Sequence, residues 1–146
     1  MPIIFEQYIE INASPETVWE VLTKPEFTRQ YMFGCDAISD WKEGSPLIWK
    51  GAKDGKVYVK GSIVKIVPGK LLGFTSFDPN DPTHKDIPSN YTTVTYTLTP
   101  EDGKTMATVT DGDFSKIEDG ETRYNRTIES WNYVLPQIKR LAERQP

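Results

Sequence analysis

The sequence is poor in the residues that build metal centres and disulfide bonds. Its 146 residues include one cysteine, Cys35, and one histidine, His84. A single cysteine excludes an intramolecular disulfide and favours a reducing compartment, so we expect a cytoplasmic protein. Neither residue has a second Cys or His with which to form a zinc site or a Cys–His pair. We therefore expect no metal and no cofactor, and interpret Cys35 as a plain, partly buried thiol and His84 as an exposed loop residue.

Long apolar runs and a surplus of positive charge are also missing. No stretch approaches the ~18 consecutive apolar residues of a membrane-spanning helix, and Met1 to Asn12 lack the basic start and apolar core of a secretory signal. The formal net charge of −4 argues against nucleic acid or an anionic membrane as the main partner. Internal repeats and long linkers are absent, so residues 1–146 are expected to form a single domain.

The strongest pattern that is present lies at the C-terminus, between Glu121 and Arg144. Apolar residues recur there at spacings of four and three: Tyr124, Ile128, Trp131, Leu135, Ile138 and Ala142. Only an α-helix places residues with this period on one face. The other face is charged and is expected to be solvated; it carries Arg126, Glu129, Lys139, Arg140 and Glu143. Such a helix, roughly 36 Å long, must bury its apolar stripe on another layer of the fold.

The rest of the chain reads mainly as strands. After a first strand, Ile3 to Asn12, the residues Ser14 and Pro15 form a helix start signal. This predicts a short helix that ends at Pro25 and a second from Glu26 to Met32. Turn signals then arrive at regular spacing, which is typical of antiparallel strands. The predicted strands are Asp36 to Trp41, Pro46 to Ala52, Val57 to Val67, Leu71 to Phe77, Tyr91 to Thr99 and Thr105 to Phe114.

Two features interrupt this meander. Gly61 lies in the middle of a long strand and predicts a bulge or bend there, with the inward phase passing from Val57 and Val59 to Val64 and Ile66. The segment from Asp78 to Asn90 is predicted to be a loop, and loops of this length are often functional.

The order of elements predicts the fold class. It is α+β: a curved antiparallel sheet of about seven strands, in the order β-α-α-β6-α, wrapped around the C-terminal helix.

Several stretches resemble a known superfamily. They are Ser14-Pro15-Glu16-Thr17-Val18-Trp19, the turn from Trp41 to Gly44 that leads to Trp49, Gly61 followed by Pro68-Gly69-Lys70-Leu71-Leu72, Thr105 with Thr108-Val109-Thr110, and Trp131, Leu135, Ile138 and Leu141 in the last helix. Together they resemble the START/Bet v 1-like helix-grip (SRPBCC) superfamily, and within it the domain similar to the activator of Hsp90 ATPase. The resemblance implies a cavity between the last helix and the sheet. Members of the superfamily bind lipids, sterols, polyketides or plant hormones, and a minority are cyclases.

Aromatic residues make up 12% of the chain, and such residues either fill a core or line a cavity. The candidates for lining a cavity are Tyr31, Met32, Trp41, Trp49, Phe74, Tyr96, Asp111, Tyr124, Ile128, Trp131 and Leu135. The loop from Asp78 to Asn90 and the residues around Met32 and Phe33 would form its entrance.

Asp111 allows two interpretations. If Ala107 and Val109 face inward, the alternation of the strand turns Asp111 inward too, as a polar anchor in the cavity. The alternative, which we favour from the sequence, is a strand that frays near Gly112 and leaves Asp111 in solvent.

The sequence contains no catalytic motif, and no residue is assigned a catalytic role. We expect the protein to bind a small, largely hydrophobic molecule, lipid-like, sterol-like or polyketide-like, without covalent chemistry. One rival is a protein-interaction module with a chaperone partner. Another is an enzyme of the cyclase or hydrolase kind that uses Asp111 as acid or base.

Overall fold

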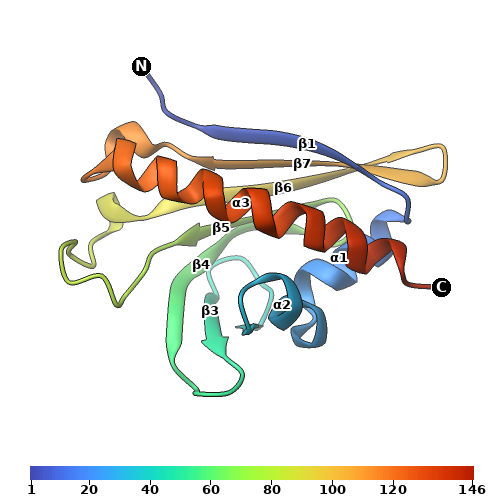
Figure 1. Cartoon of the computed structure of the whole chain (residues 1–146), viewed down its shortest axis with the longest axis horizontal. Helices are drawn as coiled ribbons and strands as arrows, with labels where there is room; N and C mark the ends of the chain where they lie inside the picture. Colours follow the sequence, from blue (N-terminus) through green and yellow to red (C-terminus); the bar gives the residue numbers. More distant parts are fainter.

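Seven strands and three α-helices make up the computed structural model, which describes residues 1–146 (Figure 1). The strands are β1 (Phe5–Ile11), β2 (Cys35–Ser39), β3 (Pro46–Gly51), β4 (Val57–Val67), β5 (Leu71–Ser76), β6 (Thr92–Glu101) and β7 (Lys104–Gly112). The helices are α1 (Pro15–Thr23), α2 (Pro25–Tyr31) and α3 (Gly120–Glu143), with short 3-10 helices at Pro88–Asn90 and Phe114–Lys116. This order confirms the predicted α+β helix-grip fold. The long loop contains one turn of 3-10 helix that the sequence did not indicate.

All seven strands form one antiparallel sheet in the order β1-β7-β6-β5-β4-β3-β2. β4 joins the two halves of the sheet, because its first part pairs with β3 and its second part with β5. Two residues of β4 have no partner in the neighbouring strand: Tyr58 in the pairing with β3 and Val64 in the pairing with β5. β4 therefore carries one bulge before Gly61 and one after it. Such bulges bend a strand.

The predicted bulge at Gly61 is therefore wrong in position. Ile63 is buried, whereas Val64, predicted to face inward, is 51% exposed. Gly61 has a different reason to be glycine: a Cβ there would lie 1.7 Å from the carbonyl oxygen of Thr75. The close approach of two backbones, rather than a bulge, requires this residue.

Helix α3 lies across the sheet, with α1 and α2 next to its C-terminal half (Figure 1). Its buried side chains are Trp131, Val134, Leu135, Ile138, Leu141 and Ala142. Trp131 lies at the middle of the helix, and the other five belong to its second half. Tyr124 and Ile128, predicted on the same stripe, are only partly buried. The first half of α3 is thus held less closely against the sheet.

Part of the charged face of α3 is not simply solvated, contrary to expectation. Lys139 Nζ donates to the carbonyl oxygen of Glu10 at 2.7 Å, and Glu143 Oε2 accepts from the backbone N–H of Asn12 at 2.8 Å. Both contacts fix the C-terminal half of α3 to the end of β1. At the start of α1, Ser14 Oγ caps the helix by accepting from Thr17 N at 3.3 Å, as predicted. No helix is long and apolar enough to span a membrane.

Candidate functional site

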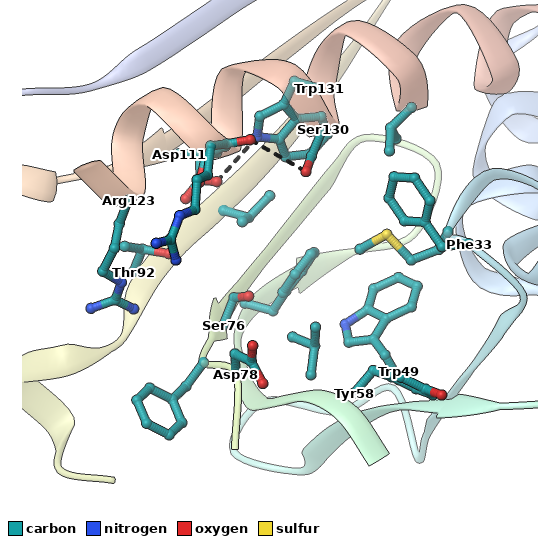
Figure 2. A pocket seen from close by; sticks show the side chains of 18 of the residues that line it. Phe33, Trp49, Tyr58, Ser76, Asp78, Thr92, Asp111, Arg123, Ser130 and Trp131 are labelled. Atoms are coloured by element: carbon teal, nitrogen blue, oxygen red, sulfur yellow. Dashed lines mark hydrogen bonds between the residues drawn. The ribbon is translucent and has the colours of Figure 1, made fainter. Parts of the chain in front are cut away.

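A cavity of about 520 Å³ lies between the first half of α3 and the central strands of the sheet (Figure 2). Its volume is within the ~300–1,000 Å³ range of small-molecule sites. Six of the predicted candidates lie in its wall: Met32, Trp49, Phe74, Tyr96, Asp111 and Trp131. They come from the end of α2, from β3, β5, β6 and β7, and from α3. The sheet and the last helix therefore bring together residues that are far apart in the sequence.

Much of the apolar wall is a row of aromatic rings. Ring centroids are 6.0 Å apart between Trp49 and Phe74, 6.4 Å between Phe74 and Tyr96, and 5.8 Å between Tyr96 and Trp131. Alternation along the strands turns Trp49, Phe74 and Tyr96 to the same face of the sheet, and Trp131 of α3 packs against them from the helix. On its far side Trp131 stacks on Phe5 at 5.8 Å. Because each ring is supported by another, the wall is preformed.

Asp111 is the buried polar group of this wall. It is 6% exposed, so the interpretation that we favoured from the sequence, a solvated residue on a frayed strand, is wrong. The strand pairing continues through this position, since Asp111 pairs with Val94 on β6 and Phe5 on β1. Asp111 Oδ2 accepts a hydrogen bond from Trp131 Nε1 at 3.1 Å, whereas Oδ1 has no partner. Burial raises the pKa of the carboxyl from 3.8 to about 6, although the neighbouring Trp131, Thr92 and Arg123 side chains act in the opposite direction.

Arg123, in the first turns of α3, is the second polar group. Its Nη2 donates to the carbonyl oxygen of Asn90 at 3.0 Å, and its Nη1 is buried without a partner. Burial lowers the pKa of the guanidinium, and the aspartates around it act in the opposite direction. Each unsatisfied polar atom costs roughly 1–3 kcal/mol when nothing binds it. The cavity thus has an acceptor and a donor available at the same end.

His84 differs from its predicted exposed state. Its side chain is 4% exposed, with Nδ1 2.7 Å from Asp81 Oδ2 and Nε2 2.8 Å from Asp119 Oδ2. Only the protonated ring has an N–H for both carboxylates, and the bond to Asp119, followed by that to Asp81, raises the histidine pKa. Asp119 directly precedes α3, so His84 links the loop between β5 and β6 to the start of that helix. Asp78, Asp81 and His84 close the cavity on this side.

The opposite rim is aromatic and partly exposed. Met32 and Phe33 line it, as predicted for the entrance, and Phe33 is 61% exposed. The Phe33 ring stacks on that of Tyr133 of α3, with centroids 5.0 Å apart. Cys35 also lines the cavity; its thiol is buried rather than partly buried, and burial raises its pKa.

Five predicted candidates lie outside the cavity wall. Tyr31 is directed into the core, where its hydroxyl donates to the carbonyl oxygen of Leu22 at 2.8 Å. Tyr124 packs edge-on against Phe114 at 5.5 Å. Leu135 borders a separate cavity of only about 10 Å³. The remaining two, Trp41 and Ile128, are partly buried and pack against the core.

The polar part of the wall on α3 was not predicted from the sequence. The helix residues there are Arg123, Arg126, Thr127, Ser130 and Val134. Apart from Arg126, they recur at spacings of four, three and four, one position before the apolar stripe. A signal for these residues was present in the sequence. It is a second helical stripe beside the apolar one, polar at its start and apolar at its end. No group of three or more His, Cys, Asp or Glu side chains is arranged to hold a metal ion.

Comparisons with known proteins agree with this architecture. A protein from Cytophaga hutchinsonii with a known solution structure is 36% identical, with 97% of this chain and 94% of that chain aligned and a TM-score of 0.75. Crystal structures of a Mesorhizobium loti protein (20% identity, 99% of both chains, TM-score 0.76) and of an Hsp90 activator from Plasmodium falciparum (16% identity, 95% of both chains, TM-score 0.72) share the fold. No curated protein matches.

The sequence profile of one family matches residues 12–143, nearly the whole chain. This match spans the two short helices, the sheet and the closing helix, and it agrees with the resemblance found in the sequence. The chain belongs to the family described as Activator of Hsp90 ATPase homolog 1-like protein.

Proposed function

We propose that the protein binds a small, largely apolar molecule in the cavity under the first half of α3, without covalent chemistry. The observation that carries the proposal is the cavity of about 520 Å³ with an aromatic wall and buried polar groups at one end. Apolar walls with a few convergent polar groups are typical of small-molecule sites. The proposal gives Asp111 a binding role rather than an acid–base role, and it places the protein in the cytoplasm.

The size of the cavity is sufficient for useful affinity. Burial of ~200 Å² of apolar ligand surface contributes about 5 kcal/mol before the cost of ordering. The aromatic rings already contact one another in the structure, so little of that free energy is needed to organise the wall. Binding in the micromolar range is the expected result.

A pair of substitutions on α3 tests this proposal. Ser130 and Asn132 are both exposed, but Ser130 lines the cavity, whereas Asn132, two residues further along, lies on another face of the same helix and does not line it. Ser130→Trp places an indole in the cavity and is expected to abolish the thermal stabilisation produced by apolar ligands. Asn132→Trp is the matched control and keeps it. The assay is a thermal shift screen with fatty acids, sterols, flavonoids and polyketide aromatics. The proposal fails if no compound stabilises the wild-type protein, or if both variants respond as the wild type does.

The family match supports a second candidate, an interaction with a chaperone. This candidate predicts that the protein stimulates the ATPase activity of an Hsp90 and that Ser130→Trp keeps the stimulation, because the cavity is not needed for it. The two candidates are therefore separated by the same variant: loss of ligand response supports cavity binding, and ATPase stimulation that survives the substitution supports a docking surface.

A further inference from the structure

Two polar atoms in the cavity wall indicate which polar groups the bound molecule carries. Asp111 Oδ1 and Arg123 Nη1 are buried side-chain atoms without a hydrogen-bond partner. Asp111 is itself more than nine-tenths buried, and its second oxygen is already used by Trp131 Nε1. A buried acceptor of this kind is satisfied best by a donor on the bound molecule.

The polar groups are gathered at one end of the cavity. Figure 2 shows Asp111, Arg123 and Thr92 on one side and Phe33 and Trp49 on the other. A molecule that fills the cavity therefore has its apolar body against the aromatic rings and its polar end toward Asp111 and Arg123. The arrangement fixes the orientation of the occupant.

The charges at this end do not favour an anion. Burial lowers the pKa of Arg123, and Asp81, Asp119, Asp111 and Asp78 act against this shift, so its positive charge already has several negative neighbours. Arg126, the other arginine of the wall, is exposed to solvent. A carboxylate placed next to Asp111 would face a like charge in a poorly solvated site, which is unfavourable.

We propose that the occupant is a neutral, ring-containing molecule with a hydroxyl group that donates a hydrogen bond to Asp111 Oδ1. Arg123 Nη1 provides a second contact, to an acceptor at the same end of the molecule. Carboxylic acids of the same shape are selected against. The inference rests on the proposed binding function and specifies the class of ligand.

Four naphthalene probes of one ring system test it. At pH 7, 2-naphthol carries a neutral donor, 2-methoxynaphthalene keeps the oxygen but lacks the donor, 2-naphthoate is an anion, and 2-methylnaphthalene is apolar. Their dissociation constants are measured by calorimetry and by quenching of tryptophan fluorescence. Trp49 and Trp131 lie in the cavity wall, so their fluorescence responds to a bound probe. The wild-type protein is expected to bind 2-naphthol about tenfold more tightly than the other three, as for one hydrogen bond to a charged acceptor.

Variants at Asp111 identify the acceptor. Asp111→Leu removes it and is expected to abolish the preference for 2-naphthol while 2-methylnaphthalene still binds. Asp111→Asn keeps an acceptor oxygen but removes the charge, so 2-naphthoate is expected to bind severalfold more tightly than it does to the wild type. Asp40→Asn, at an exposed position outside the cavity, is the control for net charge and should behave as wild type. Circular dichroism establishes that each variant is folded.

The results distinguish failure of the hydroxyl assignment from failure of the proposed cavity binding. If 2-methylnaphthalene binds the wild type but 2-naphthol binds no better, or if 2-naphthoate binds as tightly as 2-naphthol, the hydroxyl assignment is overturned and cavity binding stands. Loss of the preference in Asp111→Leu alone supports the assignment. If no probe binds and the wider ligand screen is also negative, both proposals fail.

Discussion

The two halves of α3 share one apolar stripe and lie on one sheet, yet they are packed differently. The second half, from Asn132 to Glu143, is covered by α1 and α2 and holds five of the six buried residues of the helix, and the cavity beneath it is only about 10 Å³. The first half faces the loop between β5 and β6 and, together with Val134 at the start of the second half, covers a cavity of about 520 Å³. The neighbouring stripe explains the difference: it is polar at Arg123, Thr127 and Ser130 and becomes apolar only from Val134 onward.

This division separates stability from binding. A tightly packed half can supply the free energy of folding while the other half keeps a cavity that would otherwise be costly. Substitutions that act on only one half test the separation.

The largest expected effect is in the packed half. Ile138 is 2% exposed, and Ile138→Ala is expected to lower the free energy of unfolding by about 2–5 kcal/mol, because it removes buried methyl groups and leaves a gap. Urea denaturation measures it. The dissociation constant of a cavity ligand for the folded protein should remain unchanged.

A matched pair of valines controls for residue type. Val21 on α1 is 0% exposed and Val134 in the cavity wall is 3% exposed. Val21→Ala should cost about 2 kcal/mol, and Val134→Ala about half of that, because its neighbours already border open space. Equal losses would contradict the difference in packing between the core at α1 and the wall of the cavity.

The next effect is a pH dependence that arises from the hollow half. Burial raises the pKa of Asp111 from 3.8 to about 6, so between these values the folded state holds a proton that the unfolded state has lost. Stability therefore falls as the pH rises from about 4 to 6, by an amount on the order of 3 kcal/mol relative to Asp111→Asn. Urea denaturation of both proteins from pH 4 to 7 measures the difference.

Asp113, two residues further along, is a control of opposite sign. The hydroxyl of Ser115 and the backbone of Ile3 and Ser115 lower its pKa to about 2, so its contribution is lost as the pH falls toward that value. Asp113→Asn should thus reduce stability most at neutral pH.

The Asp111 prediction has a clear contrary result. If the free energies of unfolding of wild type and Asp111→Asn change in parallel between pH 4 and 7, Asp111 titrates normally.

How much the sequence could predict also differs between the two halves. The packed half follows from periodicity, because Leu135, Ile138 and Ala142 repeat at helical spacing and can only be buried together. The strand order follows from consecutive turns, and a family resemblance added the cavity. All of this concerns the apolar pattern, which is local in the sequence.

The polar end of the cavity could not be predicted in this way. His84 contacts Asp81, three residues away, and Asp119, 35 residues away, and no local pattern marks the longer contact. Asp111 was ambiguous because alternation gives its direction but not whether the strand continues. Pairing with β1 and β6 on both sides decides that point, and pairing is a property of the whole sheet.

The smallest expected effect is local and concerns the loop that closes the hollow half. The protonated His84 ring donates to Asp81 and Asp119, with Arg123 as the cation nearby. The pKa of His84 is raised in the folded protein, so these two hydrogen bonds stabilise the loop fully below the ordinary histidine pKa of 6.5. Their stabilisation is lost as the pH rises through the pKa of His84 in the folded protein. Hydrogen exchange, corrected for intrinsic rates, should therefore show residues 78–90 less protected at high pH while β1 and α1 stay unchanged. His84→Leu should give low, pH-independent protection in this loop alone. A wild-type loop whose protection does not vary with pH would mean that the histidine does not hold the hollow half closed, and the loop would then be ordered by Asn90 and its contact with Arg123 instead.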